Sequence, residues 1–258
     1  MKLSIITINY NNRDGLRKTI ESVVTQTCRD YEYIIIDGGS TDGSVDIIKQ
    51  YDDKIDYWVS EPDKGIYNAM NKGIAKASGE YLNFMNSGDC FYDCNSIAEF
   101  LNLQVNEDIV FGNMVDSDTG KRIGCISSAN ITAADFLTAS LPHQASFIHK
   151  NAFAKYGLYD EKYKIASDWK FFFYAIIFMS APIKYVNITF AKYDNGGIST
   201  SIYGTKSELI LKEICPNRLI PDCLNSVSLK EVQKNNICKI LYSALYRLSV
   251  ALRRISKR

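Results

Sequence analysis

Carboxylates stand at several places in this sequence where a chain element ends or begins, which is where side chains can reach a ligand. The stretch YLNFMNSGDCF (81–91) has the pattern of a buried strand that ends abruptly in a turn-forming set, and Asp89 closes that set. Asp37 follows the apolar run YEYIII and precedes two glycines, which permit positive φ and a close approach of ligand. Asp37 can serve either a ligand site or an ordinary strand–turn–helix connection.

Two further carboxylates stand at predicted helix starts. Asp63 precedes a helix predicted over 65–78, and Asp168 opens the apolar stretch predicted as a helix over 168–180. Either carboxylate could cap its helix N-terminus, where negative charge is favourable, or could belong to a site. His143, in LPHQASFIHK, could bind a metal ion, contact an acceptor substrate or make a structural hydrogen bond.

The elements that must position these side chains alternate between strands and helices. Short β-branched runs predict strands over 3–8, 31–37, 55–60, 80–86, 108–115, 145–150 and 183–190. Helical patterns separate the first four, and one of them is expected to close with Gly79 as its C′ residue. This order predicts an α/β fold with a doubly wound, mostly parallel sheet flanked by helices.

Ligands of open α/β sheets bind beyond the carboxyl ends of the strands. Polar residues gather there in this chain, at 9–12 after the first strand, at Asp37 after the second and at Asp89 after the fourth. We therefore expect one shared site. The loop 193–200, with Gly196 and Gly197, could close over a ligand or form a plain turn. Neither a dinucleotide fingerprint nor a P-loop is present.

Composition narrows the class of protein. The 258 residues carry a net charge of only +1, which argues against nucleic-acid binding. Eight Lys/Arg against one Glu give residues 228–258 a charge of +7, and 22 Lys/Arg against 28 Asp/Glu give residues 1–227 a charge of −6. We expect a main domain over 1–227 and a basic amphipathic helical tail over 228–258. The tail could pack on the body or lie on an anionic membrane.

The chain has the features of a cytoplasmic protein. Its seven cysteines are odd in number and form no C-x-x-C pair, which favours free thiols in a reducing compartment. The N-terminus does not resemble a signal peptide. The longest apolar run, from Phe171, is 13 residues, whereas a membrane span needs roughly 20.

Taken together, the motifs resemble those of family 2 glycosyltransferases, which have the GT-A fold. The resemblance rests on SIITINYNN, ESVVTQT, EYIIIDGGSTDGS, EPDKGIYNAMNKGIAKASGEYLNFMNSGD and ASDWKFF, and it extends over roughly residues 2 to 200. It implies a nucleotide-sugar over the strand ends. Thr7 and Asn9 would then lie near the nucleobase, Asp37 would lie at the nucleoside, and Asp63 would have a supporting role near the nucleotide.

The resemblance also assigns the chemistry. It implies that Asp89 binds a divalent metal ion, Mn²⁺ or Mg²⁺, and that Asp168 is the general base for the acceptor hydroxyl. Similar enzymes also have a His-Gln pair before a strand, which corresponds to His143-Gln144 here. The family's strand four usually ends in D-x-D, whereas this chain has Asn86 in place of the first carboxylate. Asn86 would then replace that carboxylate beside the donor or leave its role to water, with diphosphate oxygens and waters completing the metal shell.

The expected activity is inverting transfer of a sugar from a nucleoside diphosphate, most simply UDP, to a hydroxyl of a glycan or lipid-linked acceptor in surface polysaccharide synthesis. The acceptor hydroxyl needs a base, and the leaving diphosphate needs a cation. Two alternatives stay open. One is a nucleotide-sugar-binding module that has lost turnover because of Asn86. The other is a membrane-associated assembly protein whose tail is its working part.

Overall fold

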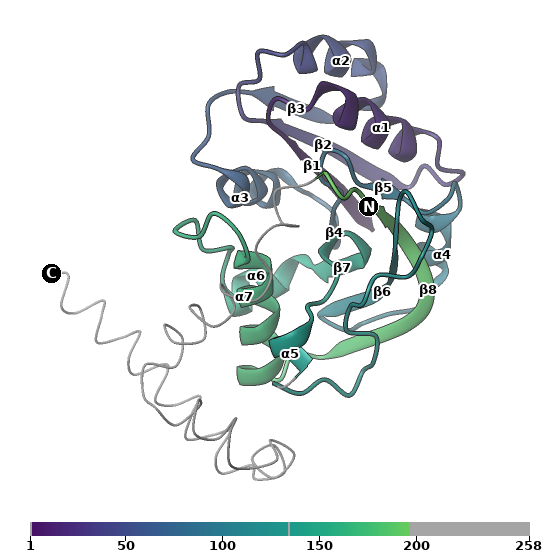
Figure 1. Cartoon of the computed structure of the whole chain (residues 1–258), viewed down its shortest axis with the longest axis vertical. Coiled ribbons are helices and arrows are strands. Elements are labelled where there is room, and N and C mark those ends of the chain that lie inside the picture. Colours follow the sequence, from purple (N-terminus) through teal and green to yellow (C-terminus); the bar gives the residue numbers. More distant parts are fainter. Residues whose placement is uncertain (1, 134, 197–258) are drawn as a thin grey trace, which may run out of the picture.

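A computed structural model describes residues 2–133 and 135–196 of the chain (Figure 1). Within these residues the strands are β1 (Leu3–Asn9), β2 (Tyr31–Asp37), β3 (Tyr57–Ser60), β4 (Tyr81–Phe84), β5 (Cys90–Phe91), β6 (Ile109–Asp116), β7 (Ser146–His149) and β8 (Ile183–Tyr193). The α-helices are α1 (Arg13–Val24), α2 (Ser44–Gln50), α3 (Ile66–Lys76), α4 (Ser96–Asn102), α5 (Asp135–Thr138), α6 (Lys150–Tyr156) and α7 (Ser167–Phe173).

The described strands form one eight-stranded sheet in the order β3-β2-β1-β4-β7-β6-β8-β5. The first four strands of this order are parallel, and their register aligns Asn9 with Asp37 and Asp37 with Ser60. β7 then pairs antiparallel with both β4 and β6, while β6 and β8 are parallel. The carboxyl ends of β1 to β3 therefore meet at one edge, and β4 marks the boundary between a parallel half and a mixed half.

Period-two side-chain alternation gives the sheet two apolar faces. Ile6, Ile8, Ile34 and Ile36 pack with residues of α3, α6 and α7, whereas Leu3, Ile5, Tyr33 and Ile35 pack with α1, α2 and α4. Figure 1 shows α3, α6 and α7 together on one side of the sheet. Both faces being covered explains why the strands read as continuous apolar runs.

The expected α/β sheet with flanking helices is confirmed, and each predicted strand is present with ends shifted by up to three residues. The long helix expected over 168–180 is α7 followed by a π-helical turn at Tyr174–Phe178. β5, α4, α5 and α6, which are short, were not predicted.

The prediction that Gly79 is the C′ residue of the helix before β4 is wrong. α3 ends at Lys76 with Ala77 as its C-cap, so Gly79 is not the C′ residue of that helix. A Cβ at Gly79 would stand 2.6 Å from the backbone nitrogen of Ser4. The glycine is needed because the chain passes directly against β1 there.

Among the described residues no helix is long and apolar enough to cross a membrane. The predicted tail, 228–258, and residues 197–200 of the loop after β8 lie outside the described residues. The boundary at residue 227 therefore stays a prediction.

Candidate functional site

Asp37 ends β2 and is fully buried among hydrogen-bond donors. Its Oδ1 accepts from Asn9 Nδ2 at 2.7 Å and from the Ser40 hydroxyl at 2.6 Å. Its Oδ2 accepts from the Ser60 hydroxyl at 2.6 Å and from the backbone amides of Gly39 and Ser40. Burial works to raise the pKa of Asp37, but the hydrogen bonds from Ser40, Ser60 and Asn9 outweigh it, so the pKa lies below its ordinary value.

The two β1 residues predicted near the base differ in their surroundings. Asn9 shares the Asp37 cluster, and its Oδ1 is buried without a hydrogen-bond partner. Thr7 is fully buried, with its hydroxyl donating to the carbonyl of Met85 at 2.8 Å and lying 3.1 Å from the Tyr33 hydroxyl. The structure therefore places Asn9 in the strand-end cluster and Thr7 in the interior beneath it.

Asp63 lies against the turn that follows Asp37. Its Oδ1 accepts from the backbone amide of Gly65 at 2.7 Å, just ahead of α3. A Cβ at Gly38 would meet Asp63 Oδ2 at 2.6 Å and the Tyr10 ring at 3.2 Å. Tyr10 is 68% exposed. An exposed aromatic ring beside a carboxylate thus stands over the β1 and β2 ends. Tyr10 was not among the predicted site residues, although a tyrosine directly after a strand end is a usable signal.

Asp89 lies five residues after Phe84, the last residue of β4, and is 5% exposed, but it has fewer hydrogen-bond donors than Asp37. Gln144 Nε2 donates to its Oδ2 at 2.9 Å, and the backbone amide of Asp194 donates to its Oδ1 at 3.0 Å. Burial raises the pKa of Asp89 to about 6 against the opposing effects of His143 and these hydrogen bonds. The charged carboxylate is therefore stabilised only in part by the protein.

A second carboxylate, Asp194, approaches the same turn from the end of β8. A Cβ at Gly88 would meet Asp194 Oδ2 at 2.6 Å, and Gly88 has a φ of +106°. Only glycine takes up that backbone conformation easily and leaves this space for the carboxylate. Asp194 was not predicted, although it lies in the glycine-containing loop 193–200, because it is 105 residues from Asp89 in the chain.

Asp168 lies in the first turn of α7 and faces two hydrogen-bond partners. The Tyr67 hydroxyl, on α3, donates to Oδ1 at 2.8 Å, and His143 Nδ1 lies 3.0 Å from Oδ2. The side chains of His143 and Asp168 keep 15% and 18% of their surface exposed, so a small group can reach them. Burial works to raise the pKa of Asp168, but His143 and Tyr67 hold it below its ordinary value.

The segment just before Asp168 is fixed by the polar face of α3. Asn71 Nδ2 donates to the carbonyl of Tyr159 and to Glu161 Oε1, both at 2.9 Å. Ala166, the N-cap of α7, has a φ of +71°, a conformation that non-glycine residues rarely adopt. These contacts and the strained residue set the direction in which α7 begins, and so the place of Asp168.

His143 directs both ring nitrogens at protein groups. Nδ1 faces Asp168, and Nε2 lies 3.1 Å from Asn86 Nδ2. A metal ion could bind the ring only if one of these contacts opened. Burial alone would lower the pKa of His143, but the hydrogen bond to Asp168 and the charges of Asp168 and Asp89 raise it. Asn86 likewise faces His143 with its Nδ2, while its Oδ1 is buried without a partner.

Two adjacent residues of one short turn, His143 and Gln144, contact the carboxylates of Asp168 and Asp89. His143 contacts Asp168, and Gln144 contacts Asp89. Asn83 of β4 anchors the turn, because its Nδ2 donates to the carbonyls of Gln144 and Ser146 at 2.9 and 3.0 Å. Asp89 and Asp168 are therefore positioned by the same part of the backbone.

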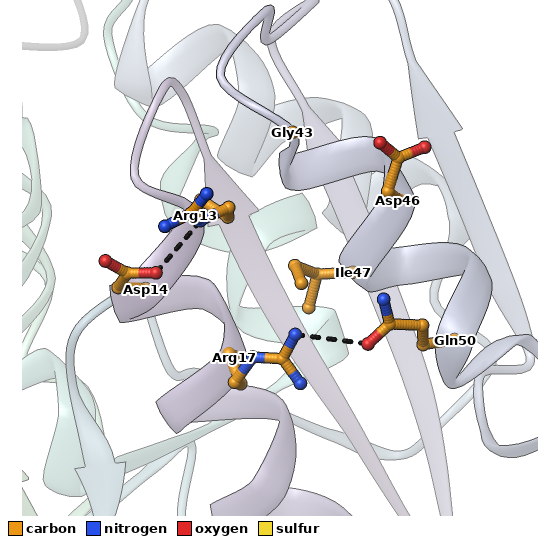
Figure 2. Close-up of a pocket in the computed structure, with 7 residues that line it drawn as sticks. All are labelled: Arg13, Asp14, Arg17, Gly43, Asp46, Ile47 and Gln50. Carbon is orange, nitrogen blue, oxygen red and sulfur yellow. Dashed lines mark hydrogen bonds and ion pairs between the residues drawn. The ribbon is translucent and has the colours of Figure 1, made fainter.

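A separate hollow of about 400 Å³ lies between α1 and α2 (Figure 2). α1 contributes Arg13, Asp14 and Arg17, and α2 contributes Asp46, Ile47 and Gln50 together with its N-cap residue Gly43. Arg13 pairs with Asp14 and Arg17 with Gln50. None of the eight residues predicted for the site lines this hollow.

The residues at the β4 end fit a divalent metal ion in part. Hard oxygen ligands are what Mg²⁺ and Mn²⁺ prefer, and Asp89 and Asp194 offer two carboxylates. Among the described residues no group of three or more His, Cys, Asp or Glu side chains is placed to hold a metal ion. The protein can therefore supply a partial shell, which the oxygens of a bound diphosphate and waters would have to complete.

Known proteins match this chain over most of its described length. The family Glycosyl transferase family 2 matches residues 4–134. An uncharacterized glycosyltransferase of Mycobacterium tuberculosis is 35% identical over 206 residues, which is 77% of each chain. A PGL/p-HBAD biosynthesis glycosyltransferase of Mycobacterium bovis is 29% identical over 206 residues, covering 77% of this chain and 79% of its own.

A solved structure shares the fold. The crystal structure of Staphylococcus aureus TarS 1-349 in complex with UDP-GlcNAc superposes with a TM-score of 0.62 at 17% identity, over 90% of this chain and 77% of that chain. The chain belongs to glycosyl transferase family 2 and has the GT-A-like fold that the sequence predicted. It is accordingly a glycosyltransferase.

Proposed function

We propose that this glycosyltransferase moves a sugar from a UDP-sugar to a hydroxyl of a glycan or lipid-linked acceptor, with inversion, in surface polysaccharide or glycolipid synthesis. The observation that carries the proposal is the shared turn: His143 contacts Asp168 while Gln144 contacts Asp89. In-line displacement needs a base on one side of the sugar carbon and charge stabilisation on the other, held at a fixed separation.

The donor would lie over the β1 to β4 ends. Asp37 holds the turn against which Asp63 and Tyr10 stand, and Tyr10 offers an exposed ring on which a base can stack. UDP is favoured as the nucleotide because the solved structure that shares this fold holds UDP-GlcNAc. The replacement Tyr10→Ala should weaken UDP binding in calorimetry without lowering stability, since the ring is mostly exposed.

Asp89 and Asp194 would hold a Mn²⁺ or Mg²⁺ ion. Such an ion, when bound, neutralises the charge that grows on the leaving diphosphate. The protein's own contribution is to place the two carboxylates: the Asp194 backbone amide donates to Asp89 Oδ1 and so ties the two residues together, and Gln144 donates to Asp89 Oδ2. Because the protein stabilises the negative charge of Asp89 only in part, a bound cation would stabilise the ionised carboxylate further.

Asp168 would take the proton of the acceptor hydroxyl. Its lowered pKa keeps it ionised near neutral pH, and its partial exposure lets a hydroxyl approach. The hydrogen bonds from Tyr67 and His143 fix the carboxylate plane, so the remaining lone pairs point in a set direction.

The experiment is a screen of UDP-sugars with Mn²⁺. Thermal stabilisation identifies the donor, since a ligand at about 100 times its Kd adds roughly 2.7 kcal/mol. UDP release in the presence of candidate glycans or lipid-linked sugars then measures transfer. Donor binding without any turnover would instead support the binding-module alternative that the change at Asn86 suggests.

The basic tail is a separate part of the proposal. Residues 235–258 combine an apolar helical pattern with Lys and Arg, as expected for a segment that lies on an anionic bilayer near a lipid-linked acceptor. The cytoplasmic side is favoured because the four described cysteines are free. Deleting residues 235–258 should release the protein from anionic liposomes and leave hydrolysis of free donor nearly unchanged; a full chain that ignores such liposomes at low salt would contradict this.

A further inference from the structure

We propose that Asn86 is a positioning residue for the base Asp168, acting through His143, and is not a ligand of the donor or its metal ion. The inference rests on the proposed function, since it assigns Asn86 a part in proton abstraction from the acceptor. It reassigns the position at which the resemblance expects a carboxylate beside the donor.

The contacts run in one chain from α3 to the turn after β4. The Tyr67 hydroxyl donates to Asp168 Oδ1, His143 Nδ1 lies at Asp168 Oδ2, and His143 Nε2 lies at Asn86 Nδ2. An ionised carboxylate only accepts hydrogen bonds, so Nδ1 must carry a proton. The one remaining variable of the ring is the state of Nε2, and Asn86 is the side chain that faces it.

An amide can serve both states of Nε2. In the arrangement seen, Nδ2 of Asn86 donates to a bare Nε2, and the ring is neutral with its proton on Nδ1. If the amide turns over, Oδ1 can accept from a protonated Nε2, and this buried oxygen then gains the partner that it lacks. Asn86 therefore holds the ring plane against Asp168 whatever the charge of the ring.

A carboxylate at position 86 could serve only the protonated ring. His143 would then lie between two carboxylates, one at position 86 and the other of Asp168, and Asp89 would add a further negative charge nearby. The Tyr67 hydroxyl contacts Asp168 and not the ring. Opposite charges favour the charged form of a group, so the ring would stay a cation. A permanent cation at Asp168 Oδ2 would make that carboxylate a weaker base. This accounts physically for an asparagine where D-x-D would have an aspartate.

The first test is Asn86→Asp, which keeps the shape of the side chain. We expect kcat to fall about tenfold or more, as part of the 10²–10⁴-fold that a general base contributes. The Kd of UDP with Mn²⁺, measured by calorimetry, should change by less than about threefold, which is under 1 kcal/mol. Tighter Mn²⁺ or UDP binding with kcat kept would overturn the proposal, and so would equal loss of kcat and affinity.

The second test needs no turnover. The chain has two histidines, so ¹⁵N-histidine labelling gives two ring signals. His149 is an internal reference of opposite tautomer, because its Nδ1 accepts from the backbone amide of Asn151 at 3.2 Å. In alkaline buffer His143 should be the Nδ1–H tautomer, and Asn86→Asp should raise the pKa of His143 because it adds a negative charge beside the ring. A His143 ring that is Nε2–H, or a pKa insensitive to Asn86→Asp, would overturn the contact.

Matched controls separate position from charge. Asn106→Asp adds the same charge at an exposed residue before β6 and should alter neither kcat nor the His143 signal. Tyr67→Phe should lower kcat with donor affinity kept. Tyr156→Phe is the matched control, because it also removes a tyrosine hydroxyl that donates to a carboxylate, that of Asp108, and it should leave kcat unchanged. If wild-type protein turns over no UDP-sugar, the proposed function fails, whereas the ring signals still test the role of Asn86.

Discussion

Asp37 and Asp89 are both buried at strand ends of one sheet, yet their acidities move in opposite directions. Asp37, in the parallel half, accepts five hydrogen bonds from side chains and backbone of three strand ends, and its pKa is lowered. Asp89, at the boundary with the mixed half, accepts two, and its pKa is raised to about 6. The balance between burial and donated hydrogen bonds decides which carboxylate the fold itself stabilises: the donors outweigh burial at Asp37, and burial outweighs them at Asp89.

The difference separates two kinds of site residue. Asp37 closes the ends of β1, β2 and β3 and shapes the turn on which Tyr10 and Asp63 stand, so its own oxygens have little capacity left for a ligand. Asp89 keeps lone pairs and an incompletely compensated charge, as a cation ligand should. Asp168 is a third case, since two donors lower its pKa while its side chain stays 18% exposed.

The largest expected effect is at this third carboxylate. Asp168→Asn keeps the shape but cannot take up a proton, so kcat should fall by roughly 10²–10⁴ while the Kd of UDP with Mn²⁺ is kept. Steady-state kinetics and calorimetry measure the two quantities. If kcat and the affinity for UDP fell together, Asp168 would be a donor-binding or structural residue and not the general base.

The next effect is at Asp89. Asp89→Asn should weaken Mn²⁺-dependent binding of UDP on the order of 10–100-fold, the loss typical of disturbed metal sites. At neutral pH its free energy of unfolding should be no lower than that of the wild type, because the raised pKa means that the ionised carboxylate costs stability in the fold. A large fall in melting temperature with UDP affinity unchanged would make Asp89 a structural residue.

Asp37→Asn should do the reverse. Replacing one acceptor oxygen with a donor leaves buried donors unpaired, which costs about 1–3 kcal/mol in unfolding free energy. The folded pKa is lowered, so the stabilisation by the carboxylate is complete above the ordinary pKa of about 3.9 and is lost as pH falls towards the folded value. Urea unfolding at neutral and at acid pH should therefore show a difference from wild type that shrinks in acid.

Ser60→Ala is the smallest change. It removes one of the five donors of Asp37 and should cost about 0.5–1.5 kcal/mol in urea unfolding, with a small rise in the pKa of Asp37. UDP affinity should change little, because the turn keeps the hydrogen bonds from Ser40 and Gly39. A loss of UDP affinity larger than the loss of stability would show that Ser60 itself reaches the nucleotide.

Much of the fold followed from the chain alone. Continuous apolar runs separated by helical patterns predicted the strands, because strands covered on both faces need apolar residues on both sides. The candidate carboxylates were found for a related reason, since each follows or opens an element at a place where a buried run gives way to polar residues. Short elements such as β5 and α6 escaped, because two to seven residues carry too little periodicity to separate strand from helix.

The sequence by itself determined the order of the elements, the family and the positions of Asp37, Asp89 and Asp168 in the fold. Only the tertiary structure decided what each side chain faces. Asp194 reaches Gly88 through the end of β8, and His143 reaches Asp168 and Asn86 because β7 pairs antiparallel with β4 and brings the preceding turn to that strand's end. Contacts between distant residues depend on strand pairing and side-chain direction, which no local pattern of apolar and polar residues encodes.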